Sequence, residues 1–98
     1  ELKFVMRHGA EPWTALACKL MLKYPNLYYS TSAFSPKHYP KDIINFANTR
    51  GKNKIMYAGY FPMGLSLDKI FSEMDNVPFN DDVWPLFLGE NAKKILKI

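Results

Sequence analysis

FVMRHGA, residues 4–10, is a run of strand-forming residues that ends in a histidine, a glycine and an alanine. Residues 2–7 are predicted to form a strand, and Glu11-Pro12-Trp13 is predicted to open a helix, because proline fits the first helical turn. Five apolar residues then recur at helical spacing and predict one buried helix face: Trp13, Leu16, Ala17, Leu20 and Met21. Pro25 and Asn26 predict the end of this helix.

The same order of strand and helix is expected twice more along the chain. LYYST (residues 27–31) and KIMYAG (residues 54–59) are predicted strands. The first is followed by a loop over residues 32–39 and by a helix that begins near Pro40, with Ile43, Ile44 and Ala47 on its apolar face. Arg50 and Gly51 are predicted to end that helix, because glycine can adopt the left-handed backbone of a helix end.

Three short helices are predicted after the third strand. Ser66 can cap the first of them, whose apolar face is predicted to contain Leu67, Ile70, Phe71 and Met74. A second helix is predicted to begin at Asn80 or Asp81 and to end at Gly89. Residues 91–96 are predicted to form a final, separate helix.

The alternation of strands and helices predicts an α/β fold with a parallel sheet and right-handed crossovers, in a single domain over residues 1–98. A closed barrel of such units needs about 250 residues and eight strands, so these units predict an incomplete barrel. A small parallel sheet standing alone leaves both of its edges open. We therefore expect either a piece of a longer chain or a domain that associates through its exposed strands.

Ligand sites in parallel α/β folds lie beyond the carboxyl ends of the strands. Three segments occupy that position here: residues 8–11, 30–33 and 59–62. His8 can bind a metal or move a proton near neutral pH, or it can be a hydrogen-bonded histidine beneath a loop. Glu11 can orient His8 or stabilise the start of the helix, where a carboxylate is favourable.

Several stretches, taken together, resemble the metal-dependent amidohydrolase superfamily, in the branch that contains aromatic-acid decarboxylases. FVMRHGA (residues 4–10) resembles the sixth barrel strand of that branch, and KYPNLYYSTSA (residues 23–33) resembles the passage into the seventh. KIMYAGYFP (residues 54–62) resembles the eighth strand, and GENA (residues 89–92) is similar to the closing helix. The resemblance covers nearly the whole chain and implies units six, seven and eight of a TIM barrel.

The resemblance implies a catalytic role for His8, which matches a sixth-strand histidine that contacts the metal or takes part in acid–base chemistry. The eighth-strand aspartate of the family, a metal ligand and proton acceptor, falls at Tyr60. A phenol is neutral near pH 7, with a pKa of about 10, so a degenerate metal site is expected. Tyr60 and Phe61, together with Glu11, are predicted to bind a small-molecule carboxylate substrate.

The cofactor implied by the family is a divalent metal such as zinc, and His8 is the residue of this chain that would contact it. Hydrolytic zinc needs about three protein ligands. The chain has two histidines and one cysteine, so no metal is expected to bind this chain alone. Cys18 lies in an apolar helical stretch, where packing is the expected role.

Two functions follow from these observations. The first is the C-terminal part of an amidohydrolase-like hydrolase or decarboxylase, inactive by itself. The second is a non-catalytic module that oligomerises through exposed sheet surface, with Phe4, Met6, Met56 and Ala58 in the contact.

The net charge of +4 comes from basic residues scattered along the chain, so nucleic acid is not an expected partner. No apolar run approaches the ~20 residues of a membrane-spanning helix, and a cytoplasmic location is expected from the single cysteine.

Overall fold

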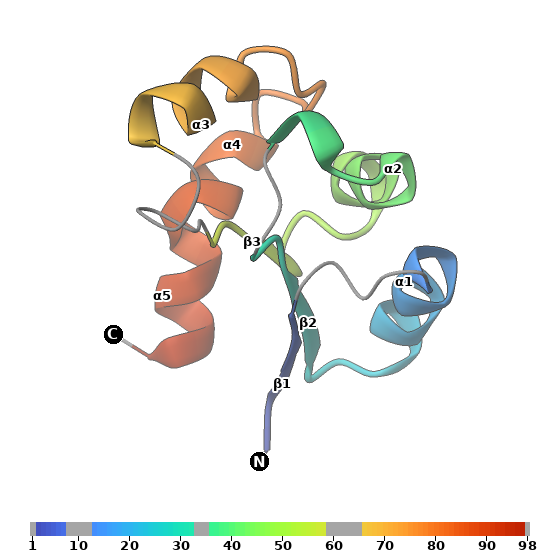
Figure 1. The fold of residues 1–98 in the computed structure, drawn as a ribbon. Helices are drawn as coiled ribbons and strands as arrows, with labels where there is room; N and C mark the ends of the chain where they lie inside the picture. Colours follow the sequence, from blue (N-terminus) through green and yellow to red (C-terminus); the bar gives the residue numbers. More distant parts are fainter. Residues whose placement is uncertain (1, 8–12, 33–35, 59–65, 98) are drawn as a thin grey trace.

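The computed structural model describes residues 2–7, 13–32, 36–58 and 66–97 (Figure 1). Strands and helices alternate along the chain as the sequence predicts. In chain order the elements are β1 (Phe4–Met6), α1 (Thr14–Lys23), β2 (Leu27–Ser30), η2 (Pro36–His38), α2 (Lys41–Thr49), β3 (Ile55–Met56), α3 (Leu67–Met74), α4 (Val83–Pro85), η3 (Leu86–Glu90) and α5 (Asn91–Leu96).

The described strands form one parallel sheet of three strands in the order β1-β2-β3. The α1 helix connects β1 to β2, and α2 connects β2 to β3, as expected of consecutive strand–helix units. The predicted α/β fold with a parallel sheet is therefore confirmed. The strands are shorter than predicted, and β3 contains only Ile55 and Met56.

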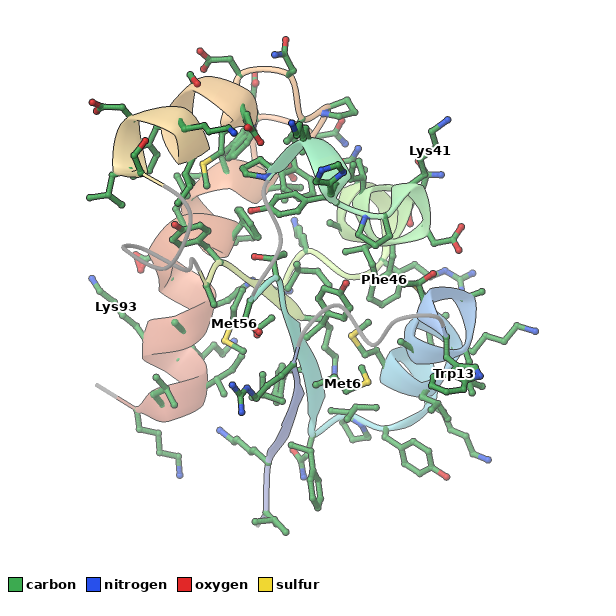
Figure 2. All side chains as sticks on the ribbon, viewed as in Figure 1. Met6, Trp13, Lys41, Phe46, Met56 and Lys93 are labelled. Atoms are coloured by element: carbon green, nitrogen blue, oxygen red, sulfur yellow. The ribbon has the colours of Figure 1, made fainter. Side chains whose placement is uncertain are left out.

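The strand register separates two faces of the sheet. Met6 pairs with Tyr29, and Tyr29 pairs with Ile55, so these three side chains share one face and pack with the main hydrophobic core. The opposite face, called the inner face below, contains Val5, Tyr28, Ser30 and Met56. Figure 2 shows Met6 on the side of α1 and Met56 on the side of α5. The sequence prediction that Phe4, Met6, Met56 and Ala58 form one contact surface is therefore wrong.

The predicted buried face of α1 is only half correct. Ala17 and Met21 are buried, whereas Trp13 is 64% exposed and Leu16 is 50% exposed. Both α2 and β2 pack against α1 and bury one part of its wide apolar stripe, and the rest of the stripe stays exposed.

The α3 helix departs from its prediction in the same way. Ser66 caps it as predicted, since the Ser66 hydroxyl accepts a hydrogen bond from the amide of Lys69. Ile70 and Met74 are buried, but Leu67 and Phe71 are exposed, because the described core lies on one side of the helix only.

Gly51 ends α2, but not for the predicted reason. Its backbone is not left-handed, because its φ angle lies outside the positive range that only glycine adopts easily. A Cβ atom at this position would instead overlap the ring of Phe46, which is itself buried. Both Arg50 and Gly51 donate their amides to the Phe46 carbonyl, so the chain turns sharply over that ring. Glycine is required here for space.

The predicted helix end at Gly89 is wrong, because α4, η3 and α5 form one continuous helix (Figure 1). The η3 segment is a π-helical turn, in which the Asn91 amide bonds to the Leu86 carbonyl. Such a turn leaves a carbonyl without its usual helical partner. The carbonyl of Phe87 accepts a hydrogen bond from the amide of Tyr57, just after β3. The irregular turn thus fastens the last helix to the sheet.

Candidate functional site

The carboxyl ends of the three strands lie at the same end of the sheet, because the strands are parallel. The helices α1 and α2 cover one face of the sheet, on the right in Figure 1. In a parallel barrel the helices form the outer ring, so the opposite, inner face corresponds to the barrel interior. The described residues at this carboxyl end of the sheet include Arg7 after β1, Thr31 and Ser32 after β2, and Tyr57 after β3.

The four site residues predicted from the sequence are His8, Glu11, Tyr60 and Phe61, and all four lie outside the described residues. Their roles stay predictions. The structure does describe the strands that precede them in the sequence. Because β2 lies between β1 and β3, the ends of β1 and β3 are about 10 Å apart across the sheet.

A pair of buried serines marks the end of the central strand. Ser30 is 7% exposed and Ser32 is 8% exposed. The Ser30 hydroxyl donates to the Ser32 hydroxyl oxygen over 3.2 Å. Ser30 pairs in register with Met56, which places its side chain on the inner face. The pair therefore puts two hydroxyl groups at the position where parallel α/β folds bind ligands.

Thr31 joins the ends of β2 and β3. Its amide donates to the Met56 carbonyl over 3.1 Å, and its hydroxyl accepts from the Ala58 amide over 3.3 Å. Thr31 is only 1% exposed, so these bonds fix the relative height of the two strand ends. The serine pair is consequently held by a rigid backbone.

Tyr39, after η2, places a phenol beside this strand end. It is 6% exposed, and its ring packs edge-on against Phe87 at 5.9 Å between centroids. Among the described residues, its hydroxyl finds no hydrogen-bond partner of good geometry. Burial raises the pKa of Tyr39 to about 12, while the nearby Thr31 hydroxyl acts in the opposite direction. The phenol is therefore neutral at physiological pH.

The raised pKa of Tyr39 predicts a loss of stability in alkali. Unfolded tyrosine titrates at about 10, so above that pH deprotonation favours the unfolded chain. The contribution is complete below pH 10 and is lost as the pH rises through 12, to a total of about 3 kcal/mol. We expect Tyr39→Phe to remove this part of the pH dependence and, at pH 7, to raise the free energy of unfolding by up to about 1 kcal/mol, because a buried unpaired hydroxyl is removed.

Urea unfolding of both proteins between pH 7 and 11 checks this expectation. Tyr24→Phe is the matched control, since it removes the same hydroxyl from a side chain that is 49% exposed. A Tyr39→Phe variant that is less stable than the parent at pH 7 would contradict the absence of a hydrogen bond at this hydroxyl.

The part of the chain that the structure describes holds no group of three or more His, Cys, Asp or Glu side chains able to bind a metal. His38, the described histidine, is exposed in η2. These residues do not fit a metal centre of their own. What they offer is hydrogen bonding: serine and threonine hydroxyls that can donate or accept, and neutral phenols that can donate.

The sequence pointed to residues 30–33 by their position after a strand but did not single out Tyr39. Tyr39 stands at the end of the loop predicted over residues 32–39, and no site role was predicted for it. The available signal was an aromatic residue directly before Pro40 and α2, a position that can pack back onto the strand end.

Among the described residues, no helix is both long and apolar enough to cross a membrane.

Comparison with known proteins gives two matches. A family model described as Amidohydrolase matches residues 1–98. Among solved structures, the chain is similar to an uncharacterized TIM-barrel protein from Bordetella bronchiseptica, with 25% sequence identity and a TM-score of 0.84. That match covers 98% of this chain and 34% of the other, so this chain spans about a third of its structural relative. No curated protein matches the chain.

Proposed function

The chain belongs to the amidohydrolase family, and we propose that it supplies units six to eight of a hydrolase or decarboxylase barrel that acts on a small carboxylate. The incomplete barrel has the strand order of three consecutive units of a TIM barrel. By itself it carries part of a site, because active sites of such barrels take residues from the ends of several different strands.

The observation that carries this proposal is the buried serine pair at the carboxyl end of β2. Ser30 and Ser32 lie 3.2 Å apart on a strand end that Thr31 fixes to β3. A carboxylate accepts hydrogen bonds only, and hydroxyl groups can rotate to donate to it. In this proposal the serines orient the carboxylate of the substrate.

The residues outside the described part have proposed roles that follow from the family. His8 transfers a proton or contacts a metal of the completed barrel, whose other ligands lie beyond this chain. Tyr60 and Phe61 border the substrate, and Glu11 lies beside it. Because Tyr60 replaces a family aspartate, the metal site is proposed to be degenerate.

A second candidate is a non-catalytic module that associates through its surface. The specific observation in its favour is the number of large apolar side chains left exposed beside β1 and on α1, among them Phe4 at 59% and Trp13 at 64%. Apolar surface of this kind marks contact sites in soluble proteins.

Binding of benzoate, a simple aromatic carboxylate, tests the enzyme proposal. We expect benzoate to shift the amide signals of Ser30, Ser32 and Met56 in NMR titrations. Ser30→Ala should weaken binding about tenfold, because one hydrogen bond to a charged group is worth roughly 1.5 kcal/mol. Ser72→Ala is the matched control: Ser72 is exposed on α3, and its hydroxyl bonds only to the Lys69 carbonyl.

The role of the serine pair would be refuted if Ser30→Ala and Ser72→Ala weakened benzoate binding equally. It would also be refuted if benzoate shifted only the amide signals of other surfaces. Zinc analysis of the same samples separates the two candidate functions. One equivalent of zinc that is lost in His8→Ala would exclude the non-catalytic module, whereas a metal-free oligomer that ignores benzoate would exclude the enzyme.

A further inference from the structure

The two edges of the sheet differ. On the outer edge of β3, the Tyr57 amide donates to the Phe87 carbonyl over 2.9 Å. The Asn91 side-chain amide donates to the Ile55 carbonyl on the same edge, also over 2.9 Å. The last helix thus provides hydrogen-bond partners for the backbone groups on this edge, through its own backbone and through one buried side chain.

The outer edge of β1 has no such cover among the described residues. The Phe4 amide donates to the Asn26 carbonyl, toward β2. Neighbouring residues of a strand direct their amides to opposite sides, so Val5 presents its amide and carbonyl away from β2. Val5 itself is 37% exposed. An open strand edge of this kind is a template for another strand.

A hollow of about 420 Å³ lies at the amino end of β1, between that strand and the segment that leads from α1 into β2. It is lined mainly by apolar groups and is called the β1 groove: Leu2, Phe4, Tyr24, Pro25, Asn26 and Leu27. The ammonium group of Lys54 donates to the carbonyls of Tyr24, Pro25 and Leu27 over 3.3, 2.7 and 3.1 Å. Three hydrogen bonds to one cation hold this wall in place, so the groove is formed before anything binds it.

The apolar surface continues from the groove along α1. Trp13, Leu16, Leu20 and Tyr24 follow one another at intervals of three and four residues, which places them on one stripe of the helix. Trp13, Leu16 and Tyr24 are each about half exposed or more. A partner that paired with β1 and placed a helix beside α1 would cover both the groove and this stripe.

The charges beside β1 oppose pairing with a second copy of this chain. Lys3 and Arg7 flank β1 on either side, and the alternation of an extended chain places them on the same face as Val5, the inner face. Antiparallel pairing of two β1 strands about Val5 would set Lys3 opposite Arg7 of the other copy, twice. Like charges directly opposite each other destabilise a sheet. A partner with carboxylates at those positions would meet the two cations instead.

We propose that the β1 edge, with the β1 groove and the outer stripe of α1, binds one further strand–helix unit in parallel orientation whose strand carries acidic residues facing Lys3 and Arg7. The unit is not a second copy of this chain. The proposal rests on the proposed function, in which the barrel unit that precedes β1 lies on this side. It also names the chemistry of that preceding unit.

Two short peptides test the proposal on the 98-residue chain. The capped peptide EVEVE has acidic side chains on one face of an extended strand and valines on the other, and KVKVK is its basic counterpart. At low salt we expect EVEVE to bind at least tenfold more tightly than KVKVK and to shift the amide signal of Val5. Val5→Pro should abolish binding, because it removes the outward amide without touching a bond to β2.

A matched pair of variants separates the local charge from the net charge. Arg7→Glu and Arg50→Glu change the net charge equally, but Arg50 is exposed at the end of α2, far along the chain from β1. We expect Arg7→Glu to reduce the preference for EVEVE severalfold and Arg50→Glu to leave most of it. Equal effects of the two variants, or no binding of either peptide, would overturn the proposal.

The mass of the protein in solution tests whether β1 pairs with a second copy of the chain. A wild-type dimer that Val5→Pro dissociates would also overturn the proposal, since it would show β1 pairing with itself. Benzoate binding reports on the serine pair at the other end of the strands and does not depend on this edge. Failure of the peptide test with intact benzoate binding would therefore leave the proposed function standing.

Discussion

Replacing Phe87 by alanine should lower the free energy of unfolding by about 3–5 kcal/mol, the range for losing a fully buried phenylalanine. Phe87 is 1% exposed. Its ring packs against four aromatic neighbours with centroids 5.0–6.1 Å away: Tyr39, Tyr57, Phe79 and Trp84. A small domain has only about 5–15 kcal/mol of stability, so this variant should be largely unfolded at 37 °C.

Urea or thermal unfolding followed by circular dichroism measures this loss. Leu88→Ala is the matched control, because Leu88 is the next residue of the same π-helical turn and is 47% exposed. Its cost should remain below about 1 kcal/mol, as for other surface substitutions. Similar losses for the two variants would mean that the aromatic cluster is not the core of the C-terminal half.

Replacing Asn91 by alanine should cost about 3 kcal/mol, because it leaves two carbonyl groups without their partner. The Asn91 side-chain amide, 2% exposed, donates to the Lys52 carbonyl over 2.7 Å and to the Ile55 carbonyl over 2.9 Å. These bonds close the outer edge of β3. Losing them should also speed hydrogen exchange at the Tyr57 amide, which the same helix holds.

The control is Asn45→Ala on α2, where the side chain is exposed and the cost should be near zero. Asn91→Asp is a sharper variant, since it keeps the size of the side chain but sets a carboxylate against two carbonyls. It should be at least as destabilising as alanine. An Asn91→Asp variant of wild-type stability would contradict the two hydrogen bonds.

The candidate site was predictable in position but not in composition. Residues 30–33 were identified because they follow the carboxyl end of a predicted parallel strand, and the serine pair lies there. Tyr39 was not identified, since its burial depends on Phe87, which is 48 positions further along the chain. Local patterns cannot report a contact between residues so far apart.

The order of the strands and of the helices up to α3, the cap at Ser66 and the parallel arrangement of the sheet could all be predicted from the sequence. Each of these depends on neighbouring residues: hydrophobic period, turn chemistry and the length of a connection. The family resemblance also came from the sequence, through short motifs in the right order.

Which apolar residues are buried, and how the sheet ends, depend on contacts between distant segments. Trp13 and Ala17 share the apolar stripe of α1, yet Trp13 is exposed and Ala17 is buried, because α2 and β2 pack against one part of that stripe. The helix runs through Gly89 by way of a π-helical turn, and the Phe87 carbonyl of that turn accepts a hydrogen bond from the distant Tyr57 amide. Burial and hydrogen bonding between distant segments are properties of the assembled fold, and they leave β3 closed and β1 open.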